Sequence, residues 1–147
     1  MAHMIHADSG EIDLAPHLRV GARTAEGTFL RSHLAARAKA LTLSPGWSAY
    51  RLDRLNLFGR SFRVTLRFHQ GWLVAVELYQ VGAVSKMSWD DWSHQEENAR
   101  KADHDTWLDA LLGPPPYAYA WGSIRSEHDP LGGYSQIVIR YGAEQAA

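Results

Sequence analysis

Three ionisable side chains, Glu96, Arg100 and Asp103, are spaced so that a helix would carry them on one face. At about 100° per residue they project within roughly 60° of one another. The same face would also carry three tryptophans, which are Trp89, Trp92 and Trp107. Because a charged group on an apolar face is costly unless it is paired, this combination requires a specific explanation.

Two interpretations of this charged cluster are open from the sequence. In the first, Arg100 pairs with Glu96 four residues before it and with Asp103 three residues after it, since helical side chains meet at both spacings. The cluster is then an ion-pair network at the edge of the core. In the second, the three tryptophans form the base of a polar pocket between the helix and the sheet. Glu96 or Asp103 would then act as an acid or base, or anchor a cationic ligand, because tryptophan faces attract cations.

The opposite face of the same predicted helix is acidic. It would carry Asp91, Glu97, Asp105 and Asp109, and residues 88–109 hold seven acidic and two basic residues, a net charge of −5. Charges at the rim of an interface mainly speed the encounter with a partner of opposite charge. This face therefore predicts contact with a basic surface of another protein.

Signatures of catalysis and of metal binding are poor in this chain. It contains no cysteine, which excludes disulfides, thiolate catalysis and cysteine-ligated zinc. His94 and His104 are ten residues apart, a poor spacing for two metal ligands on one helix. No phosphate loop or nucleophile elbow is present. We therefore expect no catalytic residue, metal or cofactor, and a binding protein is favoured over an enzyme.

Charge is nearly balanced over the 147 residues but uneven along them. Residues 1–70 hold ten basic and five acidic residues, whereas residues 71–147 hold five basic and eleven acidic ones. Arg63, Thr65 and Arg67 would share one strand face, a pattern that suits nucleic acid. The net charge of −1 and the pI of 6.7 argue against nucleic acid. We expect the basic half to meet the acidic helix instead, within the fold or across a dimer.

Hydrophobic periodicity predicts the elements that would position these residues. Apolar alternation predicts three antiparallel strands over 50–57, 62–68 and 73–79, the first bulged at Asp53–Arg54. A long helix is predicted over 89–112, with Ser88 as its N-cap and with Gly113 and three prolines as its stop. A shorter helix is predicted over 29–41 and a strand over 12–14. Strands over 117–121 and 136–141 would form a C-terminal hairpin, joined by the turn-rich segment 126–133.

These elements predict a single α+β domain over 1–147. Its antiparallel sheet would have five to six strands, made of the meander and the C-terminal hairpin, packed by one long helix and a second short helix. Residues 1–4 resemble a cloning remnant and residues 142–147 a frayed tail. No apolar run reaches the ~20 residues that cross a membrane, and no signal pattern opens the chain. We therefore expect a cytoplasmic protein without membrane contact.

The layout of residues 47–141 combines the segment from Met87 to Trp92, a helix up to Gly113, the stretch from Tyr119 to Gly122 and a strand from Ser135 to Tyr141. In this overall layout the chain resembles small bacterial proteins of the toxin-immunity type. Such proteins are compact α+β domains that bind and block a cognate toxin. The resemblance implies a protein partner and assigns no functional residue.

The functional prediction is a non-enzymatic bacterial protein-binding domain of the immunity type, which neutralises a cognate basic toxin through the acidic helix face. The alternative is a small-molecule-binding domain or enzyme that uses the tryptophan-lined pocket with Glu96, Arg100 and Asp103. Self-association as a homodimer is a third possibility, because strand edges and aromatic residues such as Trp72 and Tyr117 favour it.

Overall fold

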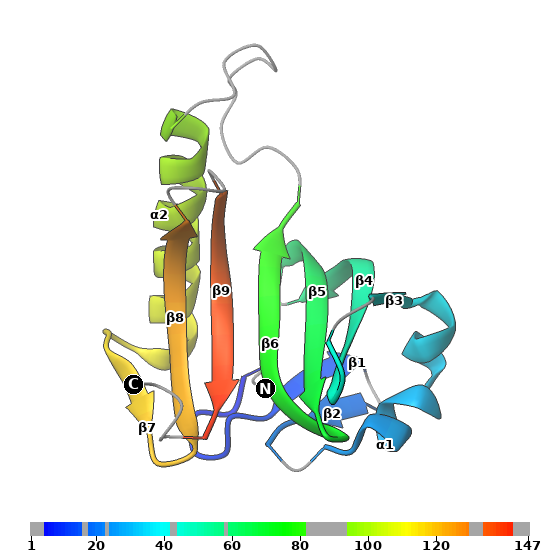
Figure 1. Ribbon diagram of the computed structural model, residues 1–147. Helices are drawn as coiled ribbons and strands as arrows, with labels where there is room; N and C mark the ends of the chain where they lie inside the picture. The colour runs from blue at the N-terminus through cyan, green and yellow to red at the C-terminus, as the bar shows by residue number, and fades with distance from the viewer. Residues whose placement is uncertain are drawn as a thin grey trace.

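The described residues form a seven-stranded antiparallel sheet, a separate two-stranded sheet and two α-helices (Figure 1). A computed structural model describes residues 5–15, 18–22, 24–41, 44–57, 59–81, 94–129 and 134–142. Its elements are β1 Ile12–Ala15, β2 Leu18–Val20, α1 Glu26–Leu30, the 3-10 helix η1 His33–Arg37, β3 Lys39–Leu41, β4 Trp47–Leu57, β5 Arg60–His69, β6 Trp72–Gln80, α2 His94–Leu112, β7 Tyr117–Tyr119, β8 Gly122–Asp129 and β9 Tyr134–Tyr141.

Strands of the large sheet follow the order β3-β4-β5-β6-β9-β8-β7. The predicted meander is confirmed as β4, β5 and β6, and the predicted bulge lies between Leu52 and Leu55. The β5–β6 turn places Gln70 and Gly71 at φ 50° and 85°, as a tight hairpin with matching twist requires. After β6 the chain forms α2 and returns to the sheet as β7, β8 and β9, so that β9 pairs with β6.

The α+β class is confirmed, but the predicted count of five to six strands is wrong. The predicted hairpin of 117–121 with 136–141 is in fact β8 paired with β9 along eight residues, with β7 added outside. The segment expected to be a turn continues β8 as far as Asp129, and Glu127 accepts two hydrogen bonds from Arg140 of β9. The turn-forming residues of this segment did not indicate this cross-strand ion pair, because its partner lies on another strand.

The predicted helix over 29–41 is also wrong as a continuous element. It is divided into α1, η1 and β3, because Ser32 takes an extended conformation and its hydroxyl donates to the carbonyl of Phe29. Ala36 and Ala40 are exposed, so burial does not favour one helix there. Instead, Lys39–Leu41 pairs with β4.

The long helix is observed as α2, which ends at Gly113 with a positive φ of 85°, as predicted. Its predicted first turn, 89–93, lies outside the described residues, as do residues 1–4 and 143–147 of the predicted terminal segments. None of the described helices is long and apolar enough to cross a membrane.

The core lies on one face of the large sheet. Phe62, Val64, Leu66 and Phe68 alternate along β5 and are fully buried there, as predicted. Phe68 meets Phe29 of α1, and Phe62 meets Trp107 of α2. Both helices therefore pack on this covered face, and α2 lies behind β8 and β9 in Figure 1.

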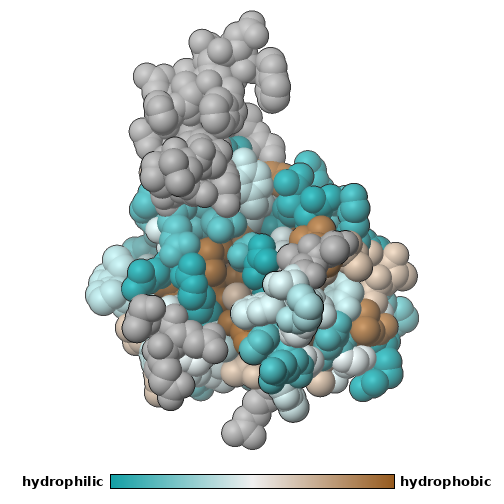
Figure 2. Space-filling view, viewed as in Figure 1, coloured by the Kyte–Doolittle hydropathy of each residue, from teal (hydrophilic) through white to brown (hydrophobic). Residues whose placement is uncertain are grey.

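The other face of the sheet, called the open face below, has no described helix packed on it. It carries alternate residues of the same strands, such as Arg63 and Arg67 of β5 and Glu77 of β6. Figure 2 views this face and shows hydrophilic residues over much of it, with smaller hydrophobic patches between them. An antiparallel sheet commonly has one solvated face of this kind.

Candidate functional site along helix α2

The predicted pocket residues that the structure describes lie on the side of α2 that faces the sheet. Arg100 is 5% exposed and Trp107 is 2% exposed, so both are buried as the helical spacing predicted. Trp107 packs on Phe62 with ring centroids 5.1 Å apart. Trp89 and Trp92 lie outside the described residues, and so does the side chain of Glu96.

Asp103 is held by an arginine of the sheet, whereas the ion-pair interpretation predicted Arg100 of its own helix as the partner. Arg60, the first residue of β5, donates through Nε to Oδ2 at 2.8 Å and through Nη2 to Oδ1 at 2.9 Å. This pair of hydrogen bonds, assisted by one from Gln80, lowers the pKa of Asp103 below its ordinary value of 3.8 although burial opposes the change. Asp103 is therefore ionised at neutral pH and joins α2 to the β4–β5 turn.

Arg100 reaches the end of the neighbouring strand β6. Its Nε donates to the carbonyl oxygen of Gln80 at 3.2 Å, and its guanidinium carbon lies 5.2 Å from the ring centroid of Tyr79. Cations are attracted to aromatic faces at such distances. Together with the Arg60–Asp103 pair, these contacts form a polar seam between α2 and the sheet.

His104 is enclosed between this seam and the core. Its ring is fully buried, neither nitrogen has a hydrogen-bond partner, and Phe62 packs beside it at 6.3 Å. Burial, followed by the positive charge of Arg100, lowers the pKa of His104 to about 4. The ring is therefore neutral at pH 7 and has no exposed nitrogen that a substrate could reach.

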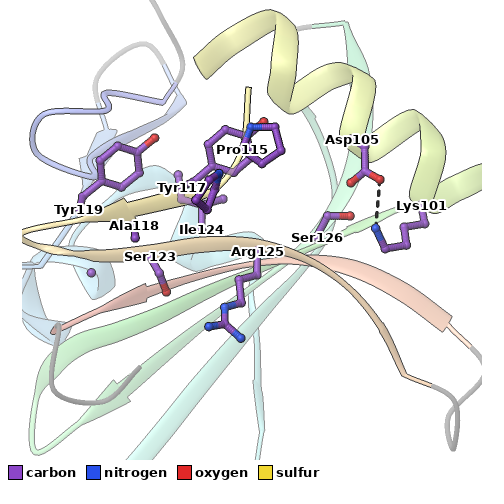
Figure 3. Close-up of a pocket in the computed structure, with 12 residues that line it drawn as sticks. Lys101, Asp105, Pro115, Tyr117, Ala118, Tyr119, Ser123, Ile124, Arg125 and Ser126 are labelled. Atoms are coloured by element: carbon purple, nitrogen blue, oxygen red, sulfur yellow. Dashed lines mark hydrogen bonds and ion pairs between the residues drawn. The ribbon is translucent and has the colours of Figure 1, made fainter. Parts of the chain in front are cut away.

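A groove of about 550 Å³ runs on the outer flank of α2, between this helix and strands β7 and β8 (Figure 3). Lys101 and Asp105 of α2 form one wall and are paired at 3.0 Å. Pro115, Tyr117 and Ser126 line the other side. The groove is not lined by Arg100, Asp103 or Trp107, so the pocket expected behind the tryptophans is not this one.

Two of the four predicted partner-binding acids are described, and both are accessible. Asp105 and Asp109 are exposed on α2, and Asp105 borders the groove. Asp91 and the side chain of Glu97 lie outside the described residues. Because Lys101 neutralises Asp105 in part, Asp109 carries the less compensated charge on this flank.

Several residues of this region were not identified from the sequence. Arg60 and Gln80 come from strand ends that pairing brings to α2. Pro115 and Pro116 were expected only to stop the helix, yet they line the groove. Tyr117 begins a strand as predicted, but it is buried against the groove and is not the exposed aromatic that was expected to favour self-association. Arg60 follows Gly59 in the predicted tight turn, but no pattern in the sequence placed this turn beside the long helix. Among the described residues, no three side chains of metal-binding type come together.

Comparison with known proteins gives one informative likeness, and it is to a solved structure. No family model matches the chain, and no curated protein matches it. A chain of the solved complex of Rhs1-CT with its cognate immunity protein RhsI1 has a similar fold, with a TM-score of 0.62 and 15% sequence identity. The alignment covers 95% of this chain and 87% of that one. The predicted resemblance to proteins of the toxin-immunity type is thereby confirmed as a likeness in fold.

Proposed function

We propose that this chain is a protein-binding domain of the toxin-immunity type, which neutralises a bacterial toxin by direct contact. The observation that supports the proposal is the likeness in fold to a chain of a toxin–immunity complex over 95% of the present chain. A fold alone hosts many functions, so the site must support the same conclusion.

The polar seam supports binding over catalysis. Asp103 is occupied by Arg60, Arg100 reaches a backbone carbonyl of β6, and His104 is sealed from solvent. These groups hold α2 on the sheet, which leaves them unsuited to act on a substrate. The geometry therefore favours a structural ion pair at the edge of the core over a reactive pocket, with Arg60 in place of the predicted Arg100 as the partner of Asp103.

The outer flank of α2 is the proposed contact with a basic partner surface. Asp105 and Asp109 are exposed there beside a groove that could take a protruding side chain. Exposed charges of this kind raise the rate of association more than they raise affinity.

The function is tested with the polypeptide encoded by the gene next to that of this chain. Expressed alone in a bacterial host, this polypeptide should arrest growth, and co-expression of the present chain should restore growth. The two purified proteins should also form a complex in size-exclusion chromatography. The proposal would be contradicted if the adjacent gene's product does not arrest growth, or if co-expression of the present chain does not relieve the arrest.

The contact surface is tested separately by charge reversal. Asp105→Lys combined with Asp109→Lys should slow association at low salt by about tenfold and weaken its dependence on salt. Asp8→Lys, an exposed acid in the turn before β1, is the matched control and should leave the rate unchanged. Equal rates for all three proteins would remove the α2 flank from the interface.

A further inference from the structure

An aromatic row crosses one end of the open face. Trp47 of β4 pairs in register with His69 of β5, and His69 pairs in register with Trp72 of β6. Directly paired residues of antiparallel strands share a face, so the three side chains lie on the same face of neighbouring strands. Trp47 and His69 have ring centroids 4.3 Å apart, so these two rings are in direct contact.

The two tryptophans of this row are exposed to an unusual degree. Trp47 is 43% exposed and Trp72 is 55% exposed, whereas Trp107 of the core is 2% exposed. Large aromatic side chains dominate the binding energy of protein interfaces, where they act as anchors in a partner's pockets. Both are fixed to paired strands, so little conformational entropy is lost when a partner orders them.

The rest of the open face is basic. Its described carboxylates are each paired with an arginine, as Arg67–Glu77, Arg140–Glu127 and Arg51–Asp53. Three further basic residues have no carboxylate partner among the described residues. These are Lys39, Arg63 and Arg125, all exposed, of which Arg63 lies over the ring of Tyr79 at 6.0 Å and Arg125 points away from α2 (Figure 3).

We propose that the open face is a second protein-contact surface, which takes an acidic protein surface and inserts Trp47 and Trp72 into it. This inference deepens the proposed function by adding a contact whose charge is opposite to that of the α2 flank. A second copy of this chain that docks through the same face is disfavoured, because two basic faces would repel each other. A second copy that docks through its acidic α2 flank is an outcome that the sedimentation experiment below distinguishes. Nucleic acid is disfavoured because proteins that bind phosphate backbones are usually strongly basic, whereas this chain has a net charge of −1 and a pI of 6.7.

The experiment uses biolayer interferometry to measure how tightly this chain binds the polypeptide encoded by the adjacent gene. Trp47→Ala combined with Trp72→Ala should weaken binding by about 30-fold or more, as expected for two anchors. The triple variant Lys39→Glu, Arg63→Glu and Arg125→Glu should slow association by about tenfold at low salt. The matched controls lie at the end of α1, on the covered side: Leu30→Ala, which removes a side chain 49% exposed, and Arg31→Glu at the C-cap. Both controls should bind as the wild type does.

The outcomes separate this inference from the proposed function. If the wild type binds and protects but the aromatic and basic variants match it, the second surface is refuted and the proposed function stands. If the wild type neither binds nor protects, both are refuted. Sedimentation of the wild type as a dimer that Trp72→Ala dissociates would assign the row to a second copy. Tight binding of a single-stranded oligonucleotide would assign the face to nucleic acid. Either of these last results would overturn the proposal.

Discussion

Arg60 and Asp103 form a bidentate ion pair that links the start of β5 to the middle of α2 across 43 residues of sequence. Both side chains are about one-third exposed, 29% and 30%, so the pair lies at the edge of the core. Together with the packing of Phe62 on Trp107, it fixes α2 against the start of β5, and its contribution to stability can be measured.

Asp103→Asn should destabilise the fold by about 1 kcal/mol at pH 7, since it removes a charge-assisted pair whose strength solvent reduces. The folded-state pKa of Asp103 is lowered, so its contribution is complete above 3.8 and is lost as the pH falls through the folded value. Urea denaturation of both proteins at pH 7 and at pH 2.5 should show the difference shrinking at the lower pH. Asp105→Asn is the control and should cost only about 0.3 kcal/mol; a difference that is the same at both pH values would argue against this origin.

His104 should make stability depend on pH in the acid range. Its folded pKa of about 4 lies below the ordinary 6.5, so the unfolded chain binds the proton first and stability falls as the pH drops from 6.5 towards 4. The loss attributable to this ring should approach roughly 3 kcal/mol. In His104→Leu this part of the pH dependence should disappear. His33→Leu, at an exposed histidine, should keep the wild-type profile in the same denaturation series.

Trp107 and Trp72 should lose very different amounts of folding free energy on the same substitution to alanine. Trp107→Ala removes a buried ring packed on Phe62 and should cost about 3–5 kcal/mol of folding free energy. Trp72→Ala removes an exposed ring and should cost less than about 1 kcal/mol. Thermal and chemical denaturation measure both, and a large loss for Trp72→Ala would show that this residue supports the fold.

Gly122 and Gly59 should differ although both have positive φ. A Cβ atom on Gly122 would lie 1.9 Å from the carbonyl oxygen of Arg140, whereas one on Gly59 meets nothing within 4 Å. Gly59→Ala should therefore cost about 1 kcal/mol, which is the conformational penalty alone. Gly122→Ala must also separate β8 from β9 and should cost several times more, about 3 kcal/mol or greater. Similar unfolding midpoints for the two variants would contradict the close approach of these strands.

Local pattern was sufficient for several features of this chain. Alternation along 62–68 identified β5 and its buried face, the turn residues located both hairpin turns of the meander, and Gly113 marked the end of α2. Helical spacing also placed Arg100 and Trp107 on the buried side. Each of these features depends on neighbours within about one turn or one hairpin, where residue type and spacing carry the information.

Other features depended on contacts between distant segments. The Ala-rich stretch after Phe29 has helical propensity, yet β3 forms there because β4 offers an unpaired edge. The partners of Asp103 and Arg100 come from β5 and β6, which no spacing within the helix can indicate. The aromatic row could not be predicted from the sequence, because it depends on how three strands are aligned with one another. Strand pairing, and hydrogen bonds between side chains of different strands and helices, determined these arrangements. Such contacts stabilise the fold only when chain segments far apart in the sequence are brought together.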